Sequence, residues 1–139
     1  MQRPCRPAPE RHDRSGTVTV ELALALPILL MVLFAAVDFA RLNVLRNSAE
    51  NAAYEGARRG ILPGATAAQV IDAAQQSLRA VGAVNTQITV TPAVLTSSTQ
   101  QVTVAVRIPL ADNAWTANAA RTTKDLVKSC TMSRERTQR

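Results

Sequence analysis

Glu21 is the only ionisable residue in an otherwise apolar run that extends from Thr17 to Val37. A carboxylate at mid-bilayer costs up to about 2.5–3.5 kcal/mol on insertion scales, so we expect it to have a partner. If the chain were cut after Gly16, Thr17 would carry a new α-amine, largely cationic at neutral pH with a pKa of about 7.7–8.0. Glu21 lies one helical turn from that amine, and the pair could form within one subunit or between neighbouring helices.

The other side chains capable of chemistry do not form a catalytic or metal-binding set. The only histidine, His12, and one of the two cysteines, Cys5, precede Gly16. A chain cut at Gly16 therefore has no imidazole for a general base or a zinc site. Cys130 is predicted to be a packed small hydrophobe, with an intermolecular disulfide as the alternative. We expect no enzymatic activity, no metal and no cofactor.

The run that carries Glu21 predicts a transmembrane helix over residues 17–40. About 20 apolar residues, each rising 1.5 Å, cross the hydrocarbon core of a bilayer. Pro27 lies inside the run, where a membrane helix tolerates it as a kink. A secretory signal peptide is the alternative, but the helical pattern continues through the segment where its cleavage site would lie.

Residues 1–16 are predicted to be a basic leader, in which four arginines are interspersed with three prolines. Positive charge beside the first membrane helix predicts that this flank stays in the cytoplasm. Everything after Ala40 is then expected outside the inner membrane.

Together these features resemble a known family. A basic leader ending in glycine, a glutamate at the fifth position after it and a hydrophobic helix resemble the prepilin-peptidase signal of type IV pilin-like proteins. Other segments are similar to TadE-like proteins, minor pseudopilins of tight-adherence (Tad/Flp) pili: Leu-Pro-Ile-Leu-Leu at 26–30, Asp-Phe-Ala-Arg at 38–41 and Ala-Ala-Tyr-Glu-Gly-Ala-Arg-Arg-Gly at 52–60. Leu22 departs from the aromatic residue that these proteins often carry after the glutamate.

The resemblance implies a membrane-anchored minor pilin or pseudopilin of a Tad pilus. It implies processing between Gly16 and Thr17 by a prepilin peptidase and a role for Glu21 in assembly. The implied partners are the membrane, other pilins or pseudopilins and the Tad assembly machinery. The alternative is an uncleaved single-pass protein whose extracytoplasmic domain binds a partner.

Beyond the membrane, residues 41–62 are predicted to continue the helix with an apolar face that becomes small near its end. Pro63 and Gly64 end it, and Thr66 to Gln69 is a capping box that starts a second, amphipathic helix ending at Gly82. The charges along the first helix, including Arg41, are expected on a solvated face, with Arg46 and Glu50 spaced for an i,i+4 contact. The second helix is expected to pack on the small-residue face.

After Gly82 the hydrophobic period becomes two, which indicates strands. Residues 87–91 and 101–108 predict an antiparallel hairpin, and Pro92 places its first strand at an edge. A helical turn is expected after Asp112 and a third strand at 126–132. The prediction is an α+β fold: a long N-terminal helix, a second helix and a small antiparallel sheet, with residues 65–132 as a small periplasmic domain.

The net charge of +6 is concentrated near the two ends of the chain. Aromatic residues make up only 3% of the sequence, and no nucleic-acid-binding module is visible. We therefore predict that residues 133–139 are a solvated charged tail, or a contact for acidic surface polymers, and that the protein has no specific nucleic-acid partner.

Overall fold

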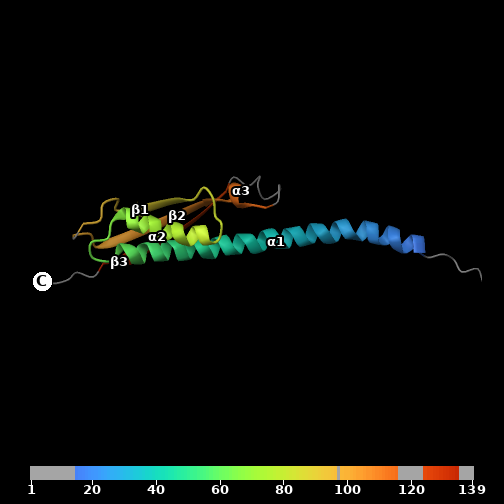
Figure 1. Cartoon of the computed structure of the whole chain (residues 1–139), viewed down its shortest axis with the longest axis horizontal. Coiled ribbons are helices and arrows are strands. Elements are labelled where there is room, and N and C mark those ends of the chain that lie inside the picture. The colour runs from blue at the N-terminus through green and yellow to red at the C-terminus, as the bar shows by residue number, and fades with distance from the viewer. Residues whose placement is uncertain (1–14, 97, 116–123, 135–139) are drawn as a thin grey trace, which may run out of the picture. The chain divides into compact units, whose positions relative to one another are not determined.

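The computed structural model describes residues 15–96, 98–115 and 124–134. The chain divides into two units, residues 1–35 and 36–139. The elements in order are α1 (Ser15–Gly60), α2 (Ala67–Ala80), β1 (Gln87–Thr91), β2 (Gln101–Pro109), α3 (Leu110–Asn113) and β3 (Asp125–Ser133), as Figure 1 shows. A long apolar N-terminal helix, a second helix and a three-stranded antiparallel sheet confirm the predicted α+β class.

The described part of the first unit is the beginning of α1. Every residue from Gly16 to Ala35 is exposed, although most of these side chains are apolar. By length and composition α1 could cross a membrane, and it is the one helix of the described residues that could. Pro27 lies inside α1 without ending it. So large an exposed apolar surface needs lipid or another protein to cover it.

The second unit is built around a sheet in the order β1-β2-β3, with both pairs antiparallel. The predicted hairpin is β1 and β2, and β1 is an edge strand that ends directly before Pro92. The predicted third strand is confirmed as β3. Alternate side chains of β2 are completely buried, as the period of two predicted: Val102, Val104, Val106 and Ile108.

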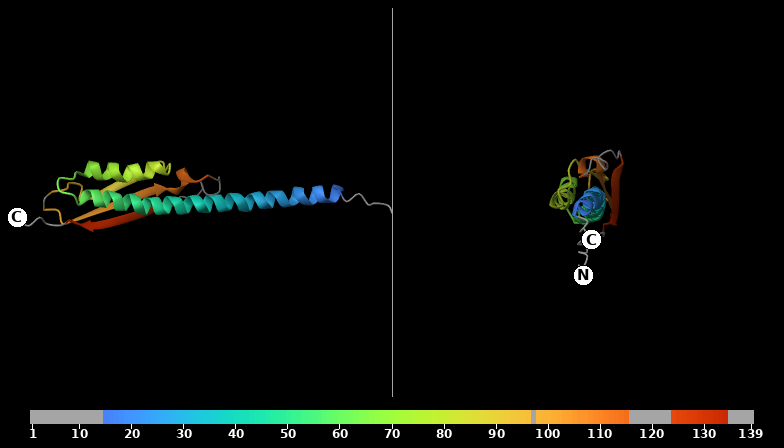
Figure 2. Two further views of the ribbon diagram at one scale, coloured as in Figure 1. Left: turned by 60° about the horizontal axis from the view of Figure 1, so that its bottom comes forward. Right: turned by 90° about the vertical axis from the view of Figure 1, so that its right-hand side faces the viewer.

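The core of this unit lies between the sheet and two helices. Figure 2 shows α2 and the later part of α1 on the same side of the sheet. Two clusters of buried side chains join them, the first containing Ala52, Leu78 and Ile108 and the second containing Ala57, Val70 and Val102. The small-residue face of α1 therefore receives α2, as predicted, and also the sheet, which was not predicted.

Glycines at the end of α1 set how closely these layers approach. A Cβ on Gly56 would lie 3.2 Å from the Cβ of Ala74 and 3.2 Å from Cγ1 of Val104. A Cβ on Gly60 would lie 2.8 Å from Cγ1 of Val102, whose side chain is fully buried. A larger residue at either position would force the sheet away from the helix.

We expect Gly56→Leu to destabilise the second unit, because overpacking a filled core costs about 1–3 kcal/mol. Asn51→Leu is the matched control on an exposed position of the same helix, where a change below about 0.5 kcal/mol is expected. Urea unfolding of the full chain in detergent micelles, followed by Trp115 fluorescence, measures both. Equal stability of the two variants would contradict close packing at Gly56.

The ends of α2 follow the predicted chemistry closely. Thr66 is the N-cap, and its hydroxyl accepts a hydrogen bond from the backbone N–H of Gln69 at 3.4 Å. The C-cap is Val81, one residue before the predicted Gly82. Gly82 instead takes a φ of +65° just past the cap, a conformation that favours glycine.

Two boundaries near the C-terminus differ from the prediction. The helical turn begins at Leu110, before Asp112 rather than after it. Ser133 belongs to β3, and Arg134 donates to the carbonyls of Leu62 at 2.9 Å and Thr96 at 2.8 Å. The predicted tail thus contributes two residues to the fold, and its remainder, 135–139, lies outside the described residues.

Candidate functional site

Gly16 lies in the first turn of α1, where nothing in the described chain requires a glycine. A Cβ added at this position would meet no atom within 4 Å, and its φ is not in the left-handed region. Glycine in a helix costs about 0.5–1 kcal/mol relative to alanine. The folded chain therefore gives no packing reason for this residue, in contrast to Gly56 and Gly60.

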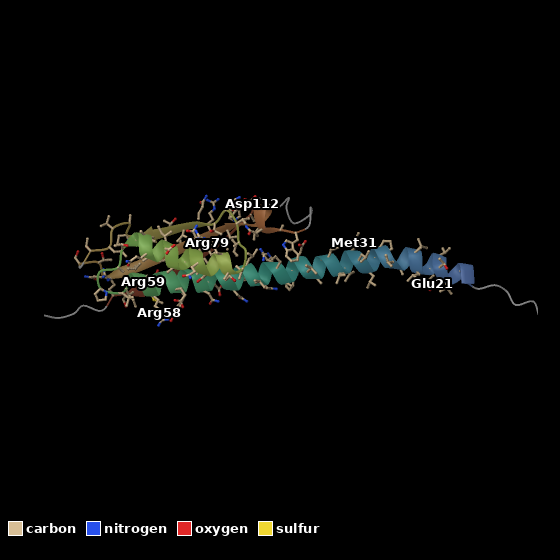
Figure 3. All side chains as sticks on the ribbon, viewed as in Figure 1. Glu21, Met31, Arg58, Arg59, Arg79 and Asp112 are labelled. Carbon is tan, nitrogen blue, oxygen red and sulfur yellow. The ribbon has the colours of Figure 1, made fainter. Side chains whose placement is uncertain are left out.

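Thr17 and Glu21 are exposed residues four positions apart on α1. That spacing places them on consecutive turns of the same helix face. Figure 3 shows Glu21 and Met31 directed away from the helix axis. The structure therefore brings the three predicted site residues into one short exposed segment; the predicted leader, residues 1–14, lies outside the described residues.

The position at which α1 begins tests whether the helix dipole alone explains why a glutamate stands at position 21. A carboxylate is favoured near a helix N-terminus by the macrodipole, but this effect fades within the first turn. The helix begins at Ser15, and its first turn contains no acidic residue. Glu21 therefore lies beyond the turn in which helix-end electrostatics act most strongly, as long as the helix begins at Ser15.

No candidate metal site accompanies this segment within the described residues. The ranges 15–96, 98–115 and 124–134 contain no group of three or more histidine, cysteine or acidic side chains placed to hold a metal ion. Cys130 lies on β3, partly buried against both core clusters. This position confirms the prediction that its thiol packs as a small hydrophobe.

Arg41 was predicted on a solvated face, and this prediction is wrong. Its guanidinium is partly buried and donates to the carbonyl of Val81 at 2.8 Å and to that of Gly82 at 3.2 Å. These are carbonyls at the C-terminal end of α2, where a helix lacks internal donors and favours a cation. The guanidinium carbon also lies 5.7 Å from the centre of the Trp115 ring.

A hollow of about 330 Å³ adjoins Arg41 in the second unit. Its lining is mostly apolar: Asp38, Phe39, Arg41, Leu42, Leu45, Leu110, Asn113 and Ala114. The amide of Asn113 is buried and already bonded, since its Nδ2 donates to the carbonyls of Val84 at 3.0 Å and Pro109 at 2.8 Å. Its oxygen accepts from the N–H of Val84 at 2.9 Å.

Glu50 pairs with Lys128 of β3, whereas the sequence predicted Arg46 as its partner. The hydrogen bond from the Lys128 ammonium, and then its charge, lowers the pKa of the Glu50 carboxyl below the ordinary value of 4.5. Arg46 contributes only a weaker electrostatic effect. Lys128 therefore joins a strand to α1 and is part of the folded unit.

The geometry defines a class of protein: a single apolar N-terminal helix, suited to membrane anchoring, whose later residues form the centre of a small α+β unit. Residues 16–58 match the family described as TadE-like protein. The predicted resemblance is confirmed over this stretch, which begins at Gly16 and covers nearly all of α1. No curated protein and no solved structure matches the chain.

Proposed function

We propose that this protein is a membrane-anchored minor pilin or pseudopilin that takes part in assembly of a Tad (Flp, type IVb-like) adhesion pilus. One observation carries the proposal: the family match begins at Gly16 and includes the apolar run of α1, residues 17–36, whose side chains are exposed and which holds one carboxylate, Glu21. The fold explains neither that glycine nor that carboxylate. A peptidase and a neighbouring helix explain both.

In the proposed mechanism a prepilin peptidase cleaves between Gly16 and Thr17 and creates a cationic amine at the start of the helix. Glu21 neutralises this amine, either one turn away in the same chain or on a neighbouring helix. In a dry bundle an unmatched cation is expensive, so the pair favours correctly offset helices. The exposed apolar side chains after Glu21 then exchange lipid contacts for contacts with other helices.

The proposed topology keeps the leader in the cytoplasm and places the second unit outside the inner membrane. It is supported by the arginines at positions 3, 6, 11 and 14, all of which precede the apolar run. Positive charge in a short flank holds that flank on the cytoplasmic side. The second unit is then free to meet other pilins, in the membrane or in the pilus.

Mass spectrometry of the protein purified from its native membrane tests this proposal. We expect the mature chain to begin at Thr17 and to co-purify with pilus components. A chain that begins at Met1 or Gln2 would contradict processing and favour the uncleaved anchored protein. A processed chain that never associates with pili or their assembly proteins would contradict the assembly role.

A further inference from the structure

We propose that one end of the second unit rests in the headgroup region of the bilayer that α1 crosses. The contact surface is formed by Phe39, Leu42, Leu110 and Trp115 and is called here the interfacial patch. This inference rests on the membrane anchoring in the proposed function, but neither on cleavage at Gly16 nor on pilus assembly.

Three of the four apolar side chains of the interfacial patch are exposed, and the fourth, Leu110, is partly exposed. Trp115 is 70% exposed, Phe39 68% and Leu42 39%. Phe39, Leu42 and Leu110 line the same hollow, and Trp115 follows directly after Ala114 of its lining. Only 3% of the residues in this chain are aromatic, and the patch uses the single tryptophan and one of the two phenylalanines.

The depth of the patch follows from the end of the apolar run. A hydrocarbon core of about 30 Å takes roughly 20 helical residues, which, counted from Thr17, end at Ala36. The apolar run itself ends at Val37, and Arg41, which belongs to the second unit, follows about one helical turn later. The centre of the Trp115 ring lies 5.7 Å from the guanidinium carbon of Arg41. The ring and Arg41 therefore lie at the same depth in the bilayer, to within about the length of one side chain.

That depth is the headgroup level, where tryptophan is most favourable in membranes. Its ring combines a large apolar body with one N–H donor, which can bond to the polar groups at this depth. The backbone of Lys124 also lies at this end, since its carbonyl accepts from the backbone N–H of Leu110 at 3.3 Å. Two acids, Asp38 in the lining of the hollow and Asp112 in α3, lie there as well, so the patch combines apolar side chains with charges of both signs, which the headgroup region accepts and the hydrocarbon core does not.

The polar groups beside the hollow suit lipid better than a peptide. The Asn113 amide is bonded to Val84 and Pro109, and the Arg41 guanidinium donates to Val81 and Gly82. A bound peptide would need donors and acceptors for its own backbone. Acyl chains and the glycerol region need only apolar cover, which Phe39, Leu42 and Leu110 supply.

The test uses the full chain in vesicles of phosphatidylethanolamine and phosphatidylglycerol. Trp115 is the only tryptophan, so intrinsic fluorescence reports its surroundings directly. We expect its emission to be blue-shifted and quenched several-fold more by a spin label next to the glycerol than by one near the acyl methyl end. We also expect several-fold protection from aqueous iodide.

The matched control moves the fluorophore away from the interfacial patch to an exposed residue of β3. Trp115→Phe combined with Ser129→Trp places the single indole on an exposed position of β3, in register with Ala105. This variant should be quenched by iodide and unaffected by either lipid label. Trp115 and Ser129 are both exposed and lie outside the buried clusters, so the fold should be retained.

The outcomes separate this inference from the proposed function. Release of the protein from vesicles by alkaline extraction would overturn the membrane anchor and with it the patch. Retention with Trp115 open to iodide and untouched by lipid labels would overturn the patch alone. Retention with Trp115 protected from iodide but untouched by lipid labels would show a protein occupant, such as a second copy, and would also overturn it.

Discussion

Glu21→Leu is expected to leave membrane insertion intact and to abolish assembly with pilus components. The substitution makes the apolar run more hydrophobic, so the isolated helix should insert at least as well as before. It also removes the partner of the proposed Thr17 amine. Breaking a fully buried ion pair by deleting one partner costs about 3–5 kcal/mol, and less where headgroups or water reach the charge.

Glu21→Gln and Glu55→Gln show whether the charge at position 21 is the one that matters in this experiment. Glutamine keeps nearly the size of glutamate without its charge, so Glu21→Gln should fail in assembly as Glu21→Leu does. Glu55→Gln removes an exposed carboxylate of the same helix outside the apolar run and should assemble normally. Membrane fractionation and co-purification of the processed protein give the two readouts. Normal co-purification of both Glu21 variants would refute charge pairing.

Gly16→Leu is expected to block processing almost completely. A prepilin peptidase must accommodate the last leader residue in a narrow catalytic groove, and the analogy with pilin-like proteins places Gly16 there. In the folded chain a side chain at Gly16 meets open space, so this substitution should not disturb the second unit. The precursor should therefore accumulate as a folded, membrane-bound protein.

Gly16→Ala is the matched control for that experiment. It adds one methyl group, and we expect slower but detectable cleavage. The ratio of precursor to mature chain on an immunoblot measures both variants, with unchanged urea unfolding as the check on folding. Normal cleavage of Gly16→Leu would exclude this bond as the processing site.

Features that depend on neighbouring residues could be predicted from the sequence. The burial of alternate β2 side chains follows from a period of two, and the Thr66 cap follows from its spacing to Gln69. Gly16 and Glu21 could be selected because they stand five residues apart at the start of an apolar run, a spacing that resembles the prepilin-peptidase signal. The outcome of their proposed roles still depends on the experiments above.

Contacts between distant segments could not be predicted in the same way. Arg41 and Val81 are 40 residues apart, Arg134 and Leu62 are 72 apart, and Lys128 and Glu50 are 78 apart. Hydrophobic period carries no information about which carbonyl or carboxylate a distant cation will meet. For the same reason Trp115 gave no sequence signal, since its meaning depends on its distance from Arg41.

The place of α1 in the core has a consequence for biogenesis. Its buried alanines are synthesised early, but the strand that contacts the same core cluster, β3, comes from the C-terminal end of the chain. Contacts of such large sequence separation form slowly, and apolar surface stays open until they do. In the proposed topology, the second unit can therefore close only after β3 has emerged from the translocation channel. Until then, the small-residue face of α1 is available to a chaperone or to the helix of another subunit.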